Sequence, residues 1–154
     1  MEEKETGRVE AFSDGVFAIA ITLLALNMKV PGRADLAGMH ATLFDALLAQ
    51  WPAYLAYLIS FLTVLIMWVN HHRMFRNIRR TDHSFMMLNG LLLMWVTLVP
   101  FPTAMLAEYI NHPYARVAAA VYSATFVLIG VTFTALWWYA SSGNRLLATN
   151  HDQR

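Results

Sequence analysis

The residues of this sequence with the greatest chemical capacity stand at the edges of apolar stretches. Asp14 directly precedes a charge-free run, and Glu10 lies four residues before it. A carboxylate at the edge of an apolar segment is costly unless it is paired, which makes it a functional candidate. Since Glu10 would repel Asp14 along one helix face, we expect a cation or a hydrogen-bond donor against Asp14. The cationic candidates are Arg8, His71, His72 and Arg73.

Two interpretations of Asp14 stay open at this point. Its carboxylate can be stabilised by the helix dipole and by water at the start of a helix. It can equally act as a structural clamp between two helices, held by one of the partners named above. Direct binding of a proton or an ion is a third role, which the sequence pattern favours less.

The histidines offer metal-binding chemistry, but their spacing argues against it. The side chains of the neighbours His71 and His72 point about 100° apart on a helix, so they cannot share one metal ion without distortion. No second histidine lies within another apolar run. We therefore expect no metal site and no cofactor. A haem-binding or redox four-helix bundle is a hypothesis that the sequence favours less than the two functions given at the end of this section.

Other chemistries are excluded by residues that the sequence lacks. It has no cysteine, which removes disulfides, thiolate catalysis, iron–sulfur clusters and cysteine zinc sites. It has no phosphate-cradling glycine loop, no H-E-x-x-H and no G-x-S-x-G motif, so we do not expect an enzyme. The net charge of +1 gives no general attraction to nucleic acid.

The elements that must position these residues are membrane helices. Of the 154 residues, 58% are hydrophobic and 14% are charged, with a mean hydropathy of +0.44. A soluble domain carries about 25% charged residues, and a chain this small cannot hide so much apolar surface from water. Charge-free runs at 46–70, 84–107 and 117–144 each reach the length of about 20 residues that a spanning helix needs. The run 15–28 becomes a span only if its helix begins near Val9.

We therefore expect an all-α membrane protein with one transmembrane domain, 1–154, and four transmembrane helices. The predicted spans are about 9–29, 50–70, 84–107 and 115–140. Eight of the eleven Lys and Arg residues fall on the side of the N-terminus, which predicts that both termini are cytoplasmic. Pro100 and Pro102 lie inside the third span and predict a kink, since proline frees backbone carbonyls.

The first predicted helix carries two stripes of side chains. At 100° per residue, an apolar stripe interrupted by one hydroxyl contains Gly15, Ile19, Thr22 and Leu26. A second stripe of small residues would let another helix approach closely, and it contains Ala11, Ala18 and Ala25. Asp14 lies at the edge of this small-residue stripe. An aliphatic stripe in a membrane helix is ordinarily packing, so the pattern alone does not establish a pore lining.

Three motifs resemble the transmembrane protein 175 potassium channel family, and most closely its bacterial single-repeat branch. The first is Arg8-x-x-x-Phe12-Ser13-Asp14, continued by a run to Leu24 that reads GVFAIAITLL. The others are WVNHHR at 68–73 and LVPFPT at 98–103. The resemblance covers roughly residues 8–139.

The resemblance implies a potassium-selective channel assembled as a homotetramer in a bacterial inner membrane, with the potassium ion and the lipid bilayer as partners. In this family the first helix lines the pore and a ring of bulky aliphatic residues replaces a carbonyl filter. Carried over by position, Ile19 forms the constriction, Leu23 and Leu26 add further layers, and Thr22 supplies a hydroxyl ring. Gly15 completes the pore-lining set.

The resemblance also implies a structural network behind the pore. Its members are Arg8, Phe12, Ser13 and Asp14, together with Trp68 and either His71 or His72. The bacterial members have six spans, whereas four are predicted here. A non-conducting membrane scaffold, or a truncated remnant of the channel fold, is therefore the alternative function.

Overall fold

The computed structural model describes residues 2–32, 42–142 and 146. Apart from short connections, these residues are helical. The elements are α1 (Glu2–Leu24), η1 (Ala25–Asn27), α3 (Leu43–Ala49), α4 (Trp51–Phe75), α5 (His83–Leu98), α6 (Pro100–Tyr109) and α7 (Ala115–Ser141).

Four of these helical segments are long and apolar enough to cross a membrane, which confirms the predicted all-α class and the number of spans. They run over Thr6–Asn27, Trp51–Phe75, His83–Tyr109 and Ala115–Ser141, with mean hydropathies of 1.8 to 1.9. The first segment reaches this length because α1 starts well before Asp14. The first charge-free run therefore lies in a helical segment that is long and apolar enough to cross a membrane.

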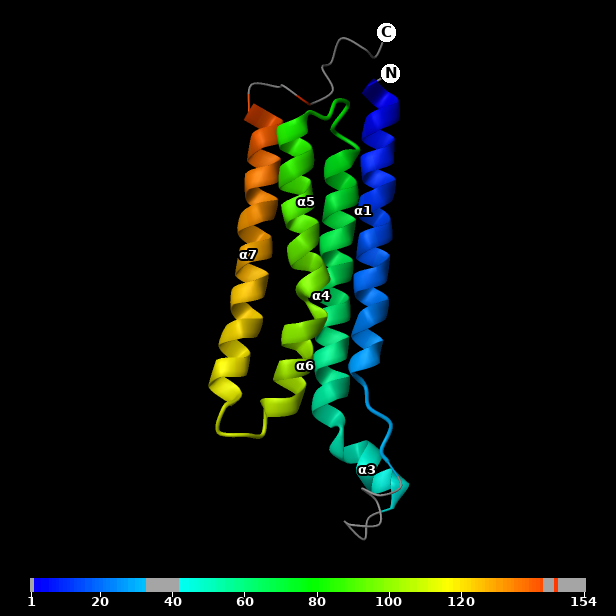
Figure 1. The fold of residues 1–154 in the computed structure, drawn as a ribbon, viewed down its shortest axis with the longest axis vertical. Coiled ribbons are helices and arrows are strands. Elements are labelled where there is room, and N and C mark those ends of the chain that lie inside the picture. The colour runs from blue at the N-terminus through cyan, green and yellow to red at the C-terminus, as the bar shows by residue number, and fades with distance from the viewer. Residues whose placement is uncertain (1, 33–41, 143–145, 147–154) are drawn as a thin grey trace.

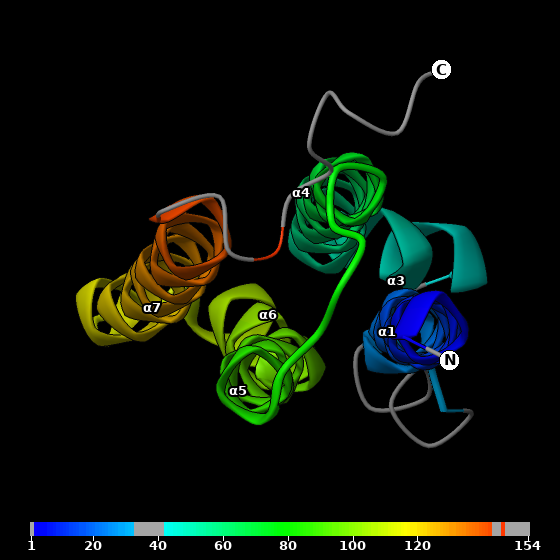
Figure 2. The same cartoon turned by 90° about the horizontal axis from the view of Figure 1, so that it is seen from above.

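The four long segments form an up-and-down bundle (Figure 1). Viewed from above, α1 and α7 lie at opposite sides of the bundle, with α4 and the α5–α6 segment between them (Figure 2). Accordingly, α1 packs on α4 and α5, whereas α7 packs on α5 and α6. The start of α1 and the end of α7 lie at the same end of the bundle (Figure 1).

One face of α1 belongs to the core. Ser13, Phe17, Ala20 and Leu24 are all buried, and their spacing of three or four residues places them on a single helix face. This face meets α4 and α5. The described residues leave the rest of the α1 circumference largely uncovered.

The predicted kink in the third span is a break between α5 and α6. α5 ends just before Val99, and α6 begins at Pro100. Neither Pro100 nor Pro102 can donate a backbone hydrogen bond, so the helical ladder is interrupted. The carbonyl of Pro100 accepts a 2.9 Å hydrogen bond from the Asn27 side-chain amide. The end of the first span therefore contacts the third span at this break.

Polar contacts tie the helix ends to the connection between α4 and α5. The Thr6 hydroxyl donates to the carbonyl of Arg79 across 3.1 Å, and the Arg79 amide donates to the carbonyl of Leu146 across 2.9 Å. Asp82 caps α5 and also accepts a 2.7 Å hydrogen bond from the Tyr139 hydroxyl on α7. The arginine-rich connection thus anchors α1, α7 and Leu146 together.

Candidate functional site

Asp14 on α1 faces α4 and contacts the indole of Trp68 there. The Trp68 Nε1–H donates a 2.8 Å hydrogen bond to the Asp14 carboxylate, and both residues are partly buried. Among the described residues, the donor that satisfies Asp14 is therefore a tryptophan, whereas the candidates argued from charge were Arg8, His71, His72 and Arg73. Because the indole is neutral, the carboxylate gains a hydrogen bond without the burial of a second charge.

Beside Asp14, three buried polar side chains connect three helices. Ser13 on α1, His71 on α4 and Asn89 on α5 are at most 2% exposed. The Asn89 amide donates to the Ser13 hydroxyl across 2.9 Å, and its carbonyl oxygen lies 2.9 Å from His71 Nε2. The Ser13 hydroxyl donates in turn to the carbonyl of Val9 across 2.8 Å. A connected network of this kind fixes the relative positions of its helices.

Aromatic rings close around His71. Its ring lies 5.3 Å from Phe17 on α1 and 4.5 Å from Phe75 on α4, measured between centroids, and Phe75 lies 5.5 Å from Phe85 on α5. His71 Nδ1 has no hydrogen-bond partner among the described residues. The ring is therefore held by packing and by the contact with Asn89.

The neighbouring His72 points away from this core and toward α1. Its Nδ1 lies 3.0 Å from the Glu10 carboxylate, and its ring is stacked on Trp68 with centroids 5.9 Å apart. One ligand atom from each of Glu10, Asp14 and His72 lies within 4.8 Å of the others. The polar contacts of the two adjacent histidines thus reach different helices. His72 contacts Glu10 on α1, and His71 contacts Asn89 on α5.

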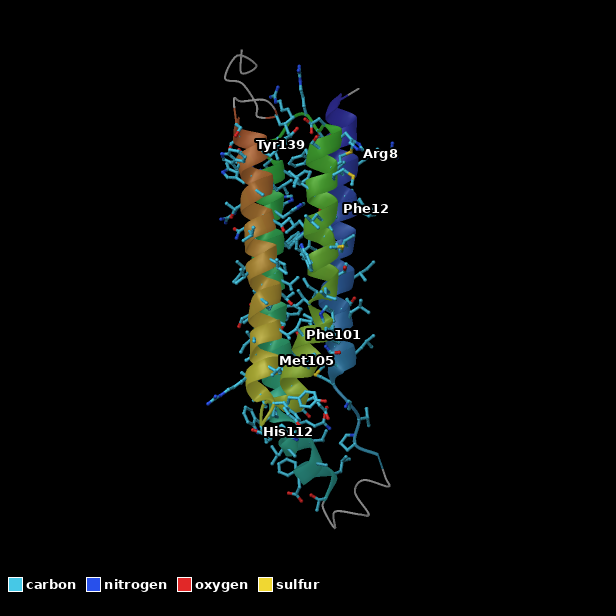
Figure 3. The ribbon with its side chains drawn as sticks, turned by 60° about the vertical axis from the view of Figure 1, so that its left-hand side comes forward. Arg8, Phe12, Phe101, Met105, His112 and Tyr139 are labelled. Carbon is cyan, nitrogen blue, oxygen red and sulfur yellow. The ribbon has the colours of Figure 1, made fainter. Side chains whose placement is uncertain are left out.

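The structure brings together most of the network implied by the resemblance, but not all of it. Ser13, Asp14, Trp68 and the two histidines all lie at the junction of α1, α4 and α5. Arg8 and Phe12 lie on the outer side of α1 (Figure 3), and Phe12 is 67% exposed. Within one chain these two residues therefore do not join the junction.

Asn89 is the member of the network that sequence reasoning missed. It is the only side-chain amide within the charge-free run 84–107, and an isolated amide in such a run must find partners inside the protein. That signal points to a buried contact. It does not identify the partners, because Ser13 and His71 are brought to Asn89 only by the packing of α1 and α4 on α5.

The residues proposed to line a pore share the opposite, uncovered face of α1 and of η1, which directly follows it. Ile19 is 57% exposed and Leu26 is 76% exposed, while Phe17 on the core side is 1% exposed. The Thr22 hydroxyl is exposed and donates to the Ile19 carbonyl across 2.8 Å. The remaining exposed members of this face are Gly15, Leu23, Ala11 and Ala18. No helix of the described chain fills the small-residue stripe of Ala11 and Ala18.

Taken together, the fold and the junction define a multi-pass helical membrane protein with one long helix face left open. Residues 8–100 match the family model described as "Endosomal/lysosomal potassium channel TMEM175". The chain therefore belongs to the TMEM175 family.

Several members of this family are similar to most of the chain. A potassium channel of Chamaesiphon minutus is 57% identical over 152 residues, which is 99% of this chain and 74% of that protein. A potassium channel of Streptomyces collinus is 57% identical over 143 residues, covering 92% of this chain and 68% of that protein. These bacterial relatives are potassium channels, not enzymes.

A more distant relative and a solved structure are also similar to this chain. The endosomal/lysosomal proton channel TMEM175 of Homo sapiens is 34% identical over 135 residues, but this chain corresponds to only 27% of that protein. The crystal structure of a lysosomal potassium-selective channel TMEM175 homologue from Chamaesiphon minutus superposes with a TM-score of 0.87. That match has 57% identity and covers 92% of this chain and 74% of the solved one.

Proposed function

We propose that this protein is a subunit of a potassium-selective channel in a bacterial inner membrane. Two bacterial relatives with 57% identity carry the name potassium channel, and a solved homologue with the same identity is described as potassium-selective. The distribution of Lys and Arg supports an orientation with both termini in the cytoplasm.

The observation that carries the proposal is the exposed face of α1. Ile19, Leu23 and Leu26 are large apolar residues, yet they are 57%, 38% and 76% exposed in the single chain. One such face cannot enclose an ion path. Closed cyclic symmetry brings the same face of every copy to a common axis, and the family resemblance favours four copies. We therefore propose a homotetramer with α1 at the centre.

Within this pore, the side chains divide into barrier and selectivity positions. Ile19, Leu23 and Leu26 form successive aliphatic layers, and a hydrophobic constriction gates by excluding water. Thr22 places a hydroxyl one turn from Ile19, where four copies would form a polar ring. Its hydrogen bond to the Ile19 carbonyl leaves oxygen lone pairs that can face an ion. Gly15 widens the path toward the start of α1.

The polar junction positions this pore face from behind. Ser13 and Asp14 hold the back of α1 against Asn89 on α5 and Trp68 on α4. The opposite side of the helix is thereby fixed in rotation about its own axis. Arg8 and Phe12, which are exposed in the single chain, are available for contact with a neighbouring copy in the tetramer.

Ion flux through liposomes tests the proposed function. Purified protein is reconstituted, and potassium efflux is compared with sodium efflux from matched vesicles. We expect potassium to leave faster than sodium through the parent protein. We expect the Thr22→Val variant to fold normally and to lose part of this preference, whereas Thr22→Ser, which keeps the hydroxyl, retains it. No flux of either ion from folded, reconstituted protein would favour the non-conducting scaffold instead.

A further inference from the structure

We propose that Glu10, Asp14 and His72 form a binding site for a divalent transition-metal ion such as Zn²⁺. The three side chains come from two helices, α1 and α4, and each presents a ligand atom within 4.8 Å of the other two. Two carboxylates and one imidazole are a donor set that suits zinc. The inference does not depend on ion conduction.

The ligand atoms are already close to the spacing that a metal requires. Zinc binds imidazole nitrogen and carboxylate oxygen at about 2.1 Å, so its ligands in a tetrahedral site lie about 3.4 Å apart. His72 Nδ1 and the Glu10 carboxylate are 3.0 Å apart. The site therefore closes with small movements of side chains that are only partly buried, and the fourth position is left to water.

Two of the ligands are held in place by the same tryptophan. Trp68 donates its indole hydrogen bond to Asp14 Oδ1, and its ring supports the stacked ring of His72. A carboxylate has further lone pairs on both oxygens, so Asp14 can bind a metal while it keeps Trp68. Such outer contacts orient metal ligands and typically change metal affinity by about 10–100-fold.

The like charges of Glu10 and Asp14 also favour a cation between them. Glu10 and Asp14 are like-charged and four residues apart on one helix, which is an unfavourable arrangement by itself. His72 is the residue that α4 places against Glu10. The side chains of His72 and Glu10 are 46% and 27% exposed, so an ion can enter from the aqueous end of the bundle. The sequence predicts no metal site, because the neighbours His71 and His72 cannot share one ion, whereas the three residues proposed here come from two helices.

Zinc titration of the full-length protein tests this inference. Chelator-washed protein in mild detergent is titrated with ZnCl₂ by calorimetry, with His72→Gln and Glu10→Gln compared to the parent. We expect one high-affinity Zn²⁺ per chain, at least tenfold weaker binding in each variant, and no competition from equimolar Mg²⁺. His112→Gln is the control, because His112 lies at the opposite end of the bundle (Figure 3).

The outcomes separate the proposed site from adventitious binding. Loss of affinity in both ligand variants, with parent affinity in His112→Gln, supports the site. Absence of zinc binding by the parent protein would overturn it, as would equal affinity in all four proteins. Elution volume and unfolding temperature are recorded for each variant, so that only folded protein is compared.

Discussion

Trp68 on α4 donates its indole hydrogen bond to Asp14 on α1 across 2.8 Å, and this contact joins the helix with the exposed face to its neighbour. Trp68→Phe removes the indole donor and leaves the partly buried Asp14 carboxylate without this hydrogen bond. The loss should lower the free energy of unfolding by about 1–3 kcal/mol or more. We expect a lower free energy of unfolding in mild detergent for Trp68→Phe and also for Asp14→Asn. The double variant should show a coupling above about 0.5 kcal/mol. Strictly additive effects would mean that the two side chains do not support each other.

Asn89 should matter for stability, because it is buried and holds two other polar side chains. Asn89→Leu keeps the side-chain volume roughly constant but removes the partner of both Ser13 and His71. Leaving buried polar groups without partners costs about 1–3 kcal/mol each. We expect a clear fall in the unfolding temperature of the purified protein.

The exposed Asn70 on α4 gives a matched control for this change. Exposed substitutions away from special features usually alter stability by less than about 0.5 kcal/mol. Asn70→Leu should therefore leave the unfolding temperature nearly unchanged. Equal effects of the two asparagine variants would remove the argument for a structural network around Asn89.

Ile19 should limit ion passage through its bulk. Ile19→Ala removes aliphatic volume from the proposed constriction, and Ile19→Asn additionally favours water there. We expect faster potassium flux from liposomes for Ile19→Ala and faster still for Ile19→Asn. The control is Val131→Ala, which trims an equally exposed aliphatic residue on α7, across the bundle from α1 (Figure 2). Parent-like flux in both Ile19 variants would show that the barrier lies elsewhere.

Subunit contacts through α1 should be visible by disulfide crosslinking, because the parent chain has no cysteine. Cysteine at Ile19 should give crosslinks between copies in native membranes, since the proposed tetramer would bring this position to a common axis. Cysteine at Phe17 should not, since Phe17 is buried against its own chain. Only monomer in both cases, also by native mass spectrometry from mild detergent, would rule out the tetramer.

The sequence predicted the all-α class and four helices long and apolar enough to span a membrane, because hydropathy acts over whole helices. The break at Pro100 was also predictable, since proline cannot continue the backbone ladder. The first span required one further step, which was to extend the helix back across Asp14. All three inferences use only local properties of the chain.

Contacts between helices were harder to predict, because they depend on rotation and register that sequence spacing does not give. Charge alone suggested a histidine or arginine for Asp14, and the structure provides Trp68. The different partners of His71 and His72 follow from their 100° separation only once α1 and α5 are placed around α4. The buried contact between the Ser60 and Thr103 hydroxyls, 2.8 Å apart on α4 and α6, had no signal in the sequence.

Thiol modification of Leu26→Cys tests whether the exposed face of α1 and η1 lines a potassium pathway. The variant is reconstituted in liposomes, and potassium flux is recorded before and after a positively charged methanethiosulfonate reagent. Only the introduced cysteine can react, and Phe17→Cys on the buried face serves as the control. We expect the reagent to reduce flux through Leu26→Cys strongly and to leave flux through Phe17→Cys unchanged, because Phe17 is buried. Unchanged flux through a fully modified Leu26→Cys protein would show that this face does not line the potassium pathway.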